Sequence, residues 1–257
     1  MPGSANFVWY ELMTTDAKAA EAFYRKVVGW STQDASQPTM AYTLFVAGET
    51  PTAGLMTLPK EAREQGARPG WMGYIGVDDV DAYADRIAKA GGTVHVPATD
   101  IPNIGRFAMM ADPQGVAFSL FKPLSDMPRP ADYTSSKPGF VGWHELLAVD
   151  GEKAFAFYSD LFGWTKAEAI DMDAMGRYQL FAAGGAPIGG MITKPAAVPM
   201  PLWTYYFQVD GAGAALERLK ADGGTVINGP MQVPGGSWIV QGLDPQGAMF
   251  SLVSANA

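Results

Sequence analysis

An internal duplication is the feature that most constrains what this chain can fold into. Residues 9–12 read Trp-Tyr-Glu-Leu, and residues 143–146 read Trp-His-Glu-Leu, an offset of 134 positions. The same offset relates further positions of the two copies: Asp16, Phe23, Tyr24, Gly29 and Trp30 recur as Asp150, Phe157, Tyr158, Gly163 and Trp164. Matches without an insertion are hard to obtain by chance, so we interpret the chain as two copies of one domain.

Composition limits the class of protein. The 257 residues are 48% hydrophobic and 17% charged, which suffices for two globular domains near the usual size of about 100–150 residues. A net charge of −8 and a pI near 4.7 argue against partners such as nucleic acid or an anionic membrane. The absence of cysteine excludes disulfides, thiolate metal sites and a cysteine nucleophile. Without a signal peptide or a long apolar run, the sequence predicts a cytoplasmic protein.

Hydrophobic spacing predicts a repeated module within each copy. Residues 7–13 are typical of a strand, and Thr15 or Asp16 can cap a following helix. The helix is indicated by an apolar stripe formed by Ala20, Phe23, Tyr24 and Val27. Residues 41–47 and 52–58 are then typical of strands. The same order begins again at residue 71, so each domain is predicted to hold two strand–helix–strand–strand–strand modules.

Two shorter signatures fix the boundaries of the copies. Gly-Gly-Thr-Val occurs at 91–94 and 223–226, and the turn sequence Asp-Pro-Gln-Gly occurs at 112–115 and 244–247. A proline-rich stretch separates the copies. We therefore predict domains at 7–123 and 138–254, joined by a linker at 124–137.

These signatures, in the same order in both copies, resemble the vicinal oxygen chelate superfamily of glyoxalases, bleomycin-resistance proteins and extradiol dioxygenases. The resemblance implies an α+β fold of two tandem glyoxalase-like domains. Each domain would hold two βαβββ modules whose curled mixed sheets form a cupped cavity. Members of the family use that cavity for a divalent metal and a chelating substrate, or hold a drug there without metal.

The resemblance also implies where metal ligands would stand, on strands of each module. These positions fall on Trp9, Met72, Ser119 and the region of Gly54-Leu55 in the first domain, and on Trp143, Thr204, Ser251 and Gly190-Met191 in the second. None is a histidine or a carboxylate, the groups that hard divalent ions prefer. We therefore expect no metal cofactor. The chain has two histidines, and we expect His144 to point away from the ligand face, at a surface or an interface.

Glu11 and Glu145 are the candidate catalytic groups. Each lies two residues beyond Trp9 or Trp143, so it shares a strand face with that tryptophan. Each carboxylate is either a general base or ligand anchor, or a structural group paired with a buried donor. Each tryptophan is either a stacking wall for a flat ligand or part of the core.

The copies differ where Arg106 aligns with Trp238. An Arg106 inside the cavity would bind an anion or pair with Glu11, whereas a solvated Arg106 is the alternative. Trp238 would favour an apolar ligand. The predicted ligand-binding set is therefore Trp9, Met72, Arg106, Ser119, Trp143, Thr204, Trp238 and Ser251.

Three functions remain open. The first is a metal-free protein that binds a small organic molecule. The second is an enzyme, a glyoxalase-type lyase or isomerase or an extradiol dioxygenase, with an unusual site near Glu11 or Glu145. The third is a non-catalytic scaffold. We favour the first, and we expect the two domains to pair within one chain, with a homodimer left open.

Overall fold

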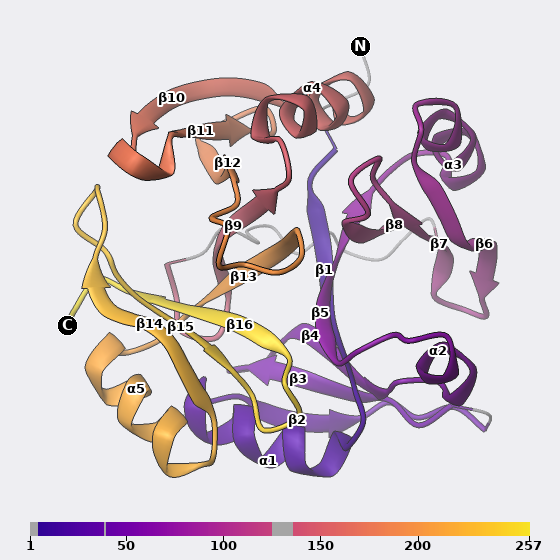
Figure 1. Ribbon diagram of the computed structural model, residues 1–257. Coiled ribbons are helices and arrows are strands. Elements are labelled where there is room, and N and C mark those ends of the chain that lie inside the picture. Colours follow the sequence, from indigo (N-terminus) through magenta and orange to yellow (C-terminus); the bar gives the residue numbers. More distant parts are fainter. Residues whose placement is uncertain (1–4, 39, 125–135) are drawn as a thin grey trace. The chain divides into compact units, whose positions relative to one another are not determined.

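The computed structural model describes residues 5–38, 40–124 and 136–257 of the chain. Within these ranges, sixteen strands and five α-helices follow one another, and the order strand, helix, three strands occurs four times (Figure 1). The predicted α+β class and the βαβββ modules are confirmed. Residues 125–135, most of the predicted linker, lie outside the described residues.

The first copy contains modules that begin at β1 and β5. The first module comprises β1 (Phe7–Thr14), α1 (Ala17–Val27), β2 (Ser31–Asp34), β3 (Thr43–Ala47) and β4 (Thr50–Thr57). A short helix, α2 (Lys60–Glu64), lies in the connector. The second module comprises β5 (Gly70–Gly76), α3 (Val80–Lys89), β6 (Thr93–Ile101), β7 (Gly105–Ala111) and β8 (Ala117–Pro123).

The second copy repeats this order. Its first module comprises β9 (Val141–Ala148), α4 (Gly151–Phe162), β10 (Thr165–Asp171), a 3-10 turn (Asp173–Met175), β11 (Arg177–Ala182) and β12 (Pro187–Thr193). Its second comprises β13 (Leu202–Gln208), α5 (Ala212–Ala221), β14 (Thr225–Gln232), β15 (Trp238–Leu243) and β16 (Met249–Ser254). Asp16 and Asp150 cap α1 and α4 through their side chains, accepting the amide hydrogens of Ala19 and Lys153.

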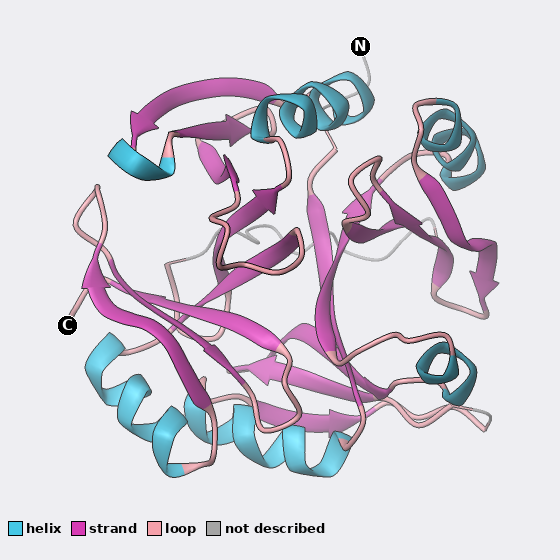
Figure 2. Cartoon of the chain, in the orientation of Figure 1, coloured by secondary structure: helices cyan, strands magenta, loops and turns pink. Residues whose placement is uncertain are grey.

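The strands of the described residues form two mixed sheets of eight strands each, and strands predominate over helices (Figure 2). The strand orders are β2-β3-β4-β1-β5-β8-β7-β6 and β10-β11-β12-β9-β13-β16-β15-β14. The pairs β1–β4, β5–β8, β9–β12 and β13–β16 are parallel. The two copies therefore share one topology, as their sequence repetition predicts. No helix of the described ranges is long and apolar enough to span a bilayer.

The described residues form two compact units. Unit 1 contains residues 5–8, 73–124 and 144–203, and unit 2 contains residues 9–38, 40–72, 136–143 and 204–257. Each unit thus combines a module of one sequence copy with a module of the other.

In unit 2, a buried polar chain joins the two copies. The Tyr24 hydroxyl donates to the Asp244 carboxylate at 3.2 Å and accepts the Trp71 indole hydrogen at 2.9 Å. The same carboxylate accepts the backbone amides of Gln246 and Ala248, each at 2.9 Å. Burial raises the pKa of Tyr24, and the neighbouring Asp244 raises it further, so the phenol remains a donor.

Unit 1 contains the same chain of hydrogen bonds. The Tyr158 hydroxyl donates to Asp112 at 3.2 Å and accepts from the Trp203 indole at 3.1 Å. Asp112 also accepts the amides of Gln114 at 2.8 Å and Val116 at 2.9 Å. The tyrosine of each Phe-Tyr pair and the aspartate of each Asp-Pro-Gln-Gly turn therefore bind each other across the two copies, which sequence spacing alone did not reveal.

Candidate functional site

A hydrogen-bonded network on the first module connects two of the predicted site residues. The Trp9 indole nitrogen donates to the Tyr42 hydroxyl at 3.1 Å, and that hydroxyl donates to a Glu11 carboxylate oxygen at 2.9 Å. Glu11 is 7% exposed, whereas Trp9 and Tyr42 are half-buried. Burial, together with the nearby Glu11 charge, raises the pKa of Tyr42, so its hydroxyl stays protonated.

Gly54 makes room for this network. Its backbone lies opposite Glu11 in the β1–β4 pairing and opposite Leu44 in the β3–β4 pairing. A side-chain carbon at this position would lie 1.8 Å from the Tyr42 hydroxyl oxygen and 3.2 Å from the Trp9 indole nitrogen. Tyr42 therefore covers the glycine directly, and only a residue without Cβ fits there.

The face that carries this network is turned away from the helix of the module. Phe45, on the opposite face of β3, contacts Tyr24 of α1 with ring centroids 5.8 Å apart. Side chains alternate along a strand, so Leu44 and its partners Gly54 and Glu11 lie on the other face. The four strands of each module make up one half of an eight-stranded sheet, which we call a half-sheet. We call the face of a half-sheet that is turned away from its module's helix the helix-distal face.

The second copy has an equivalent glycine and tyrosine beside Glu145. Glu145 is half-buried and lies opposite Gly190 in the β9–β12 pairing. A side-chain carbon at Gly190 would lie 2.2 Å from the Tyr178 ring carbon Cζ. Tyr178 thus covers Gly190 as Tyr42 covers Gly54.

The sequence interpretation missed both tyrosines. Their signal is a further repeat, Tyr-x-Leu-Phe-x-Ala-Gly, at residues 42–48 and 178–184. Its offset is 136 rather than 134 or 132, because the segment from Trp164 to Tyr178 is two residues longer than the segment from Trp30 to Tyr42.

Two predicted residues of the second copy, Thr204 and Ser251, lie together in unit 2. Their hydroxyl oxygens are 2.9 Å apart, and both side chains are buried. Ser251 lies opposite Tyr206 on β13 and opposite Gln241 on β15. The Gln241 amide donates to the Tyr206 hydroxyl at 2.8 Å. These polar groups form one row across three neighbouring strands.

Trp143 packs beside this row. Tyr206, Ile239 and Val253 form a buried apolar cluster, and the partly buried Trp143 and Val233 pack against it. Trp143 is therefore partly buried against the core, and its role as a stacking surface for a ligand stays a prediction.

The corresponding row in the first copy is less polar. Tyr74 on β5 lies opposite Ser119 on β8, which lies opposite Met109 on β7. Ser119 and Met72 are buried. The offset of 132 places Met72 and Met109 at the positions of Thr204 and Gln241, so this copy lacks the second hydroxyl and the amide.

The sequence left Arg106 either inside the cavity or in solvent, and the structure places it among surface carboxylates. Its guanidinium binds Asp81 of α3 through two nitrogens at 2.7 and 2.8 Å, and Asp100 at 2.8 Å. These contacts put Arg106 on the helix-facing side of β7. Arg106 therefore neither pairs with Glu11 nor provides an anion site on the helix-distal face.

Trp238 also lies on the helix-facing side. Gly242 of the same strand faces Leu219 of α5, whose side chain would lie 2.9 Å from an added carbon. Trp238 alternates in phase with Gly242, whereas Ile239 and Gln241 lie on the helix-distal face. Alignment by spacing identified equivalent positions correctly but did not establish which face they occupy, and a shift of one residue reverses the face.

His144 is a core residue. It is fully buried, its ring stacks on Phe7 with centroids 4.3 Å apart, and its Nδ1 lies 2.7 Å from the Ile188 carbonyl oxygen. The expected surface position is wrong. The expected interface is found, because Phe7 belongs to the other sequence copy. Burial lowers the pKa of His144 to about 4, so the ring is neutral at physiological pH.

This burial predicts a pH dependence of stability. As the pH falls, His144 takes up a proton near pH 6.5 in the unfolded chain but only near pH 4 in the folded chain. The stabilisation is therefore fully present above about pH 6.5 and is lost as the pH falls toward 4. We expect His144 to contribute a loss of about 2 kcal/mol between pH 7.5 and pH 5.

Urea denaturation at the two pH values measures this loss. His144→Phe, which keeps an aromatic ring over Phe7, should reduce the difference by that amount. His95→Gln is the control, because His95 is exposed and should leave the difference unchanged. An equal pH dependence in wild type and His144→Phe would contradict the assignment.

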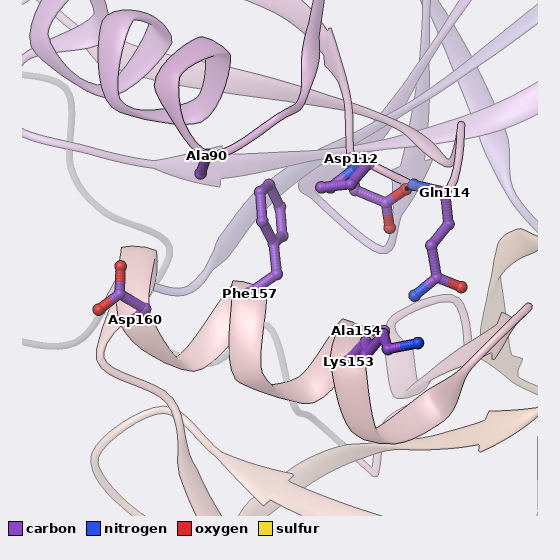
Figure 3. Close-up of a pocket in the computed structure, with 8 residues that line it drawn as sticks. Ala90, Asp112, Gln114, Lys153, Ala154, Phe157 and Asp160 are labelled. Carbon is purple, nitrogen blue, oxygen red and sulfur yellow. Dashed lines mark hydrogen bonds between the residues drawn. The ribbon is translucent and has the colours of Figure 1, made fainter.

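A hollow of about 440 Å³ lies elsewhere in unit 1 (Figure 3). Phe157 points from α4 toward Ala90 and the turn that carries Gln114, with Asp160 on the same helix. In unit 2, Lys26 is the equivalent of Asp160 and Asp222 is the equivalent of Ala90. Lys26 and Asp222 form an ion pair. No residue that the sequence predicts for the site lines the unit 1 hollow.

Comparison with known proteins identifies the family. The model of the Glyoxalase/Bleomycin resistance protein/Dioxygenase superfamily matches residues 6–120 and 141–252. The chain belongs to this superfamily. CFP32 of Mycobacterium tuberculosis, a candidate glyoxylase by its name, is 34% identical over 247 residues, covering 95% of this chain and 93% of that protein.

Two further relatives broaden the comparison. The anthracycline biosynthesis protein DauV of Streptomyces sp. is 30% identical over 258 residues, covering 95% of this chain and 91% of DauV. The homoprotocatechuate 2,3-dioxygenase of Brevibacterium fuscum, solved with 3,4-dihydroxyphenylacetate, superposes with a TM-score of 0.67 at 14% identity. That match covers 99% of this chain and 82% of the dioxygenase. At this identity the structural likeness establishes the fold alone.

The residues of this superfamily member do not fit the metal that the family implies. At the expected positions, Trp9 directs its indole N–H at Tyr42, Gly54 lies under the Tyr42 ring, and Thr204 is bonded to Ser251. Within the described ranges, no three histidine, aspartate or glutamate side chains are grouped as a metal site would require.

Proposed function

We propose that this superfamily member binds a small, planar organic molecule on the helix-distal faces of its half-sheets, without a resident divalent metal. The observation that carries this proposal is the Trp9–Tyr42–Glu11 network. It occupies the strand positions where the family resemblance implies a metal, and it does so with an indole, a phenol and one hydrogen-bonded carboxylate.

The chemistry of the network suits a flat ligand. The half-buried Trp9 ring offers a flat apolar surface, and its position is fixed by the hydrogen bond to Tyr42. Glu11 supplies an anionic oxygen beside it, held by the Tyr42 hydroxyl. Mostly apolar surfaces with a few placed polar groups are typical of small-molecule sites.

One relative supports the same class of ligand. DauV is named for anthracycline biosynthesis, and anthracyclines contain a flat fused-ring system.

Two other functions make different predictions. A metal-dependent lyase, isomerase or dioxygenase centred on Glu11 or Glu145 requires bound metal, and the residues around Glu11 do not favour it. A scaffold without a site predicts that no planar ligand binds.

We expect 1,4-dihydroxyanthraquinone to quench the tryptophan fluorescence of protein dialysed against EDTA, in a saturable titration. Trp9→Phe should weaken binding by about 0.5–1.5 kcal/mol, because it removes part of the stacking surface and the bond to Tyr42. Trp238→Phe is the matched control, since Trp238 is also half-buried but lies on the helix-facing side. Its affinity should match that of the wild type.

Saturable binding in the presence of EDTA would support the proposal. An absence of binding by the EDTA-treated protein would contradict it. Binding that returns only when a divalent ion is restored would favour the metal-dependent enzyme instead.

A further inference from the structure

The buried pair Thr204–Ser251 has a hydrogen-bond donor left over. Each hydroxyl has one hydrogen, and a single bond between the two oxygens, 2.9 Å apart, uses only one of them. The side chains are 1% and 0% exposed. Within the described residues, neither hydroxyl has another hydrogen-bond partner. A buried donor without an acceptor is unfavourable by roughly 1–3 kcal/mol, so the pair indicates an acceptor other than the described residues.

The neighbouring polar side chains donate hydrogen bonds in one direction, toward Tyr206. Asn228 donates its side-chain amide to Gln241 at 3.4 Å, and Gln241 donates to the Tyr206 hydroxyl at 2.8 Å. Because the Tyr206 oxygen accepts from Gln241, the phenol hydrogen is directed away from Gln241. Tyr206 lies opposite Ser251 across β13 and β16. The row therefore continues from the Thr204–Ser251 pair to Tyr206 and Gln241, and the donor it leaves for an acceptor is the remaining hydrogen of that pair.

The acceptor must be uncharged. Strands β13 to β16 contain no lysine or arginine that could neutralise an anion. An ionised carboxylate placed against this buried row would lose its hydration without gaining a cation, which is strongly unfavourable. A carbonyl oxygen accepts the same hydrogen bonds at a much smaller desolvation penalty.

The remainder of the face suits the apolar body of such a ligand. The partly buried Trp143 and Val233 pack against Tyr206, Ile239 and Val253, and they lie at the edge of the buried cluster. The first copy does not share this property, because Met72 replaces Thr204 and Met109 replaces Gln241.

We propose that the helix-distal face of β13, β15 and β16 binds an uncharged aromatic ketone or quinone, whose carbonyl oxygen accepts the remaining hydrogen of the Thr204–Ser251 pair. This inference rests on the proposed function and deepens it. The ring system lies against Trp143 and Val233. The family resemblance implies that a ligand is chelated by a metal, whereas here the carbonyl oxygen is held by hydrogen bonds. The equivalent face of the first copy does not select for a carbonyl.

Infrared difference spectroscopy with 9-fluorenone tests the hydrogen bond directly. The carbonyl stretching band of the bound ketone should lie at lower wavenumber than in an apolar solvent, because donation to the oxygen weakens the C=O bond. The double variant Thr204→Val/Ser251→Ala should abolish that shift. Equilibrium dialysis should show that it weakens fluorenone binding by roughly 3- to 10-fold.

Two controls isolate the carbonyl. Fluorene has the same ring system without the oxygen, and the double variant should leave its affinity unchanged. Ser254→Ala removes another buried hydroxyl of β16, from the helix-facing side, and should leave fluorenone binding unchanged.

The outcomes separate this inference from the proposed function. If wild type binds fluorenone and fluorene equally and the band is unshifted, the carbonyl site is wrong while small-molecule binding stands. If the band shifts but the double variant leaves it shifted, the donor is another group and the inference is again wrong. If wild type binds neither compound, both proposals fail. If the double variant does not fold, two measurements on the wild type still test the carbonyl site. They are the ratio of its affinities for fluorenone and fluorene, and the position of the carbonyl stretching band of bound fluorenone.

Discussion

Asp112→Ala is expected to destabilise the chain by about 3–5 kcal/mol, the larger of two mutational effects that the structure predicts. The buried Asp112 carboxylate accepts the amides of Gln114 and Val116 and the Tyr158 hydroxyl. Its removal leaves all three donors without their acceptor, and Tyr158 is itself the acceptor for the Trp203 indole. The loss therefore affects both the turn and the contact between the two copies.

Urea denaturation at neutral pH measures this effect. Asp85→Ala is the matched control, because Asp85 is exposed on α3 and its loss should change stability by less than about 0.5 kcal/mol. Asp244→Ala should resemble Asp112→Ala, since Asp244 makes the equivalent bonds in unit 2. A loss below about 1 kcal/mol for both buried variants would show that these carboxylates do not hold the copies together.

Gly54→Ala is expected to cost about 2–4 kcal/mol and to abolish binding of a planar ligand at the first module. The added methyl group would lie 1.8 Å from the Tyr42 hydroxyl oxygen and 2.4 Å from its ring carbon Cζ. Tyr42 must move, which breaks its bonds to Trp9 and to the buried Glu11.

A double-mutant cycle tests whether that clash is the cause. In a Tyr42→Ala background the methyl group no longer meets the ring, so Gly54→Ala should cost at least 1 kcal/mol less than in wild type. Gly70→Ala is the control, because its nearest neighbour, the Arg68 carbonyl oxygen, would be 4.0 Å away. Equal costs of Gly54→Ala in both backgrounds would place the strain elsewhere.

The sequence predicted the elements well because their signals are local and occur twice. The apolar stripe that ends at Val27 predicted α1, and Asp16 proved to be its cap. The offsets of 134 and 132 predicted four modules, and the structure contains them in that order. Repetition supported each assignment with a second, independent copy of the same pattern.

The site was harder to predict because it depends on contacts between distant residues. Trp9 and Glu11 share a face by alternation alone, but Tyr42 joins them from the loop that leads into β3, 31 positions from Glu11. Arg106 and Trp238 occupy equivalent positions, yet both side chains lie on the helix-facing side of their strands. A shift of one residue along the strand would have placed them on the helix-distal face. The contact between Tyr158 and Asp112 links two sequence copies, which no local pattern within either copy specifies.

Metal content of the purified protein tests the central claim most directly. We predict well under one equivalent of any divalent ion by elemental analysis, and no rise in melting temperature with added manganese, iron, nickel or zinc. A tight site would stabilise the fold by about 2.7 kcal/mol at a hundredfold excess over Kd, so a thermal melt would detect it. One equivalent of bound metal, lost on Glu11→Ala or Glu145→Ala, would contradict the claim that the chain binds its ligand without metal.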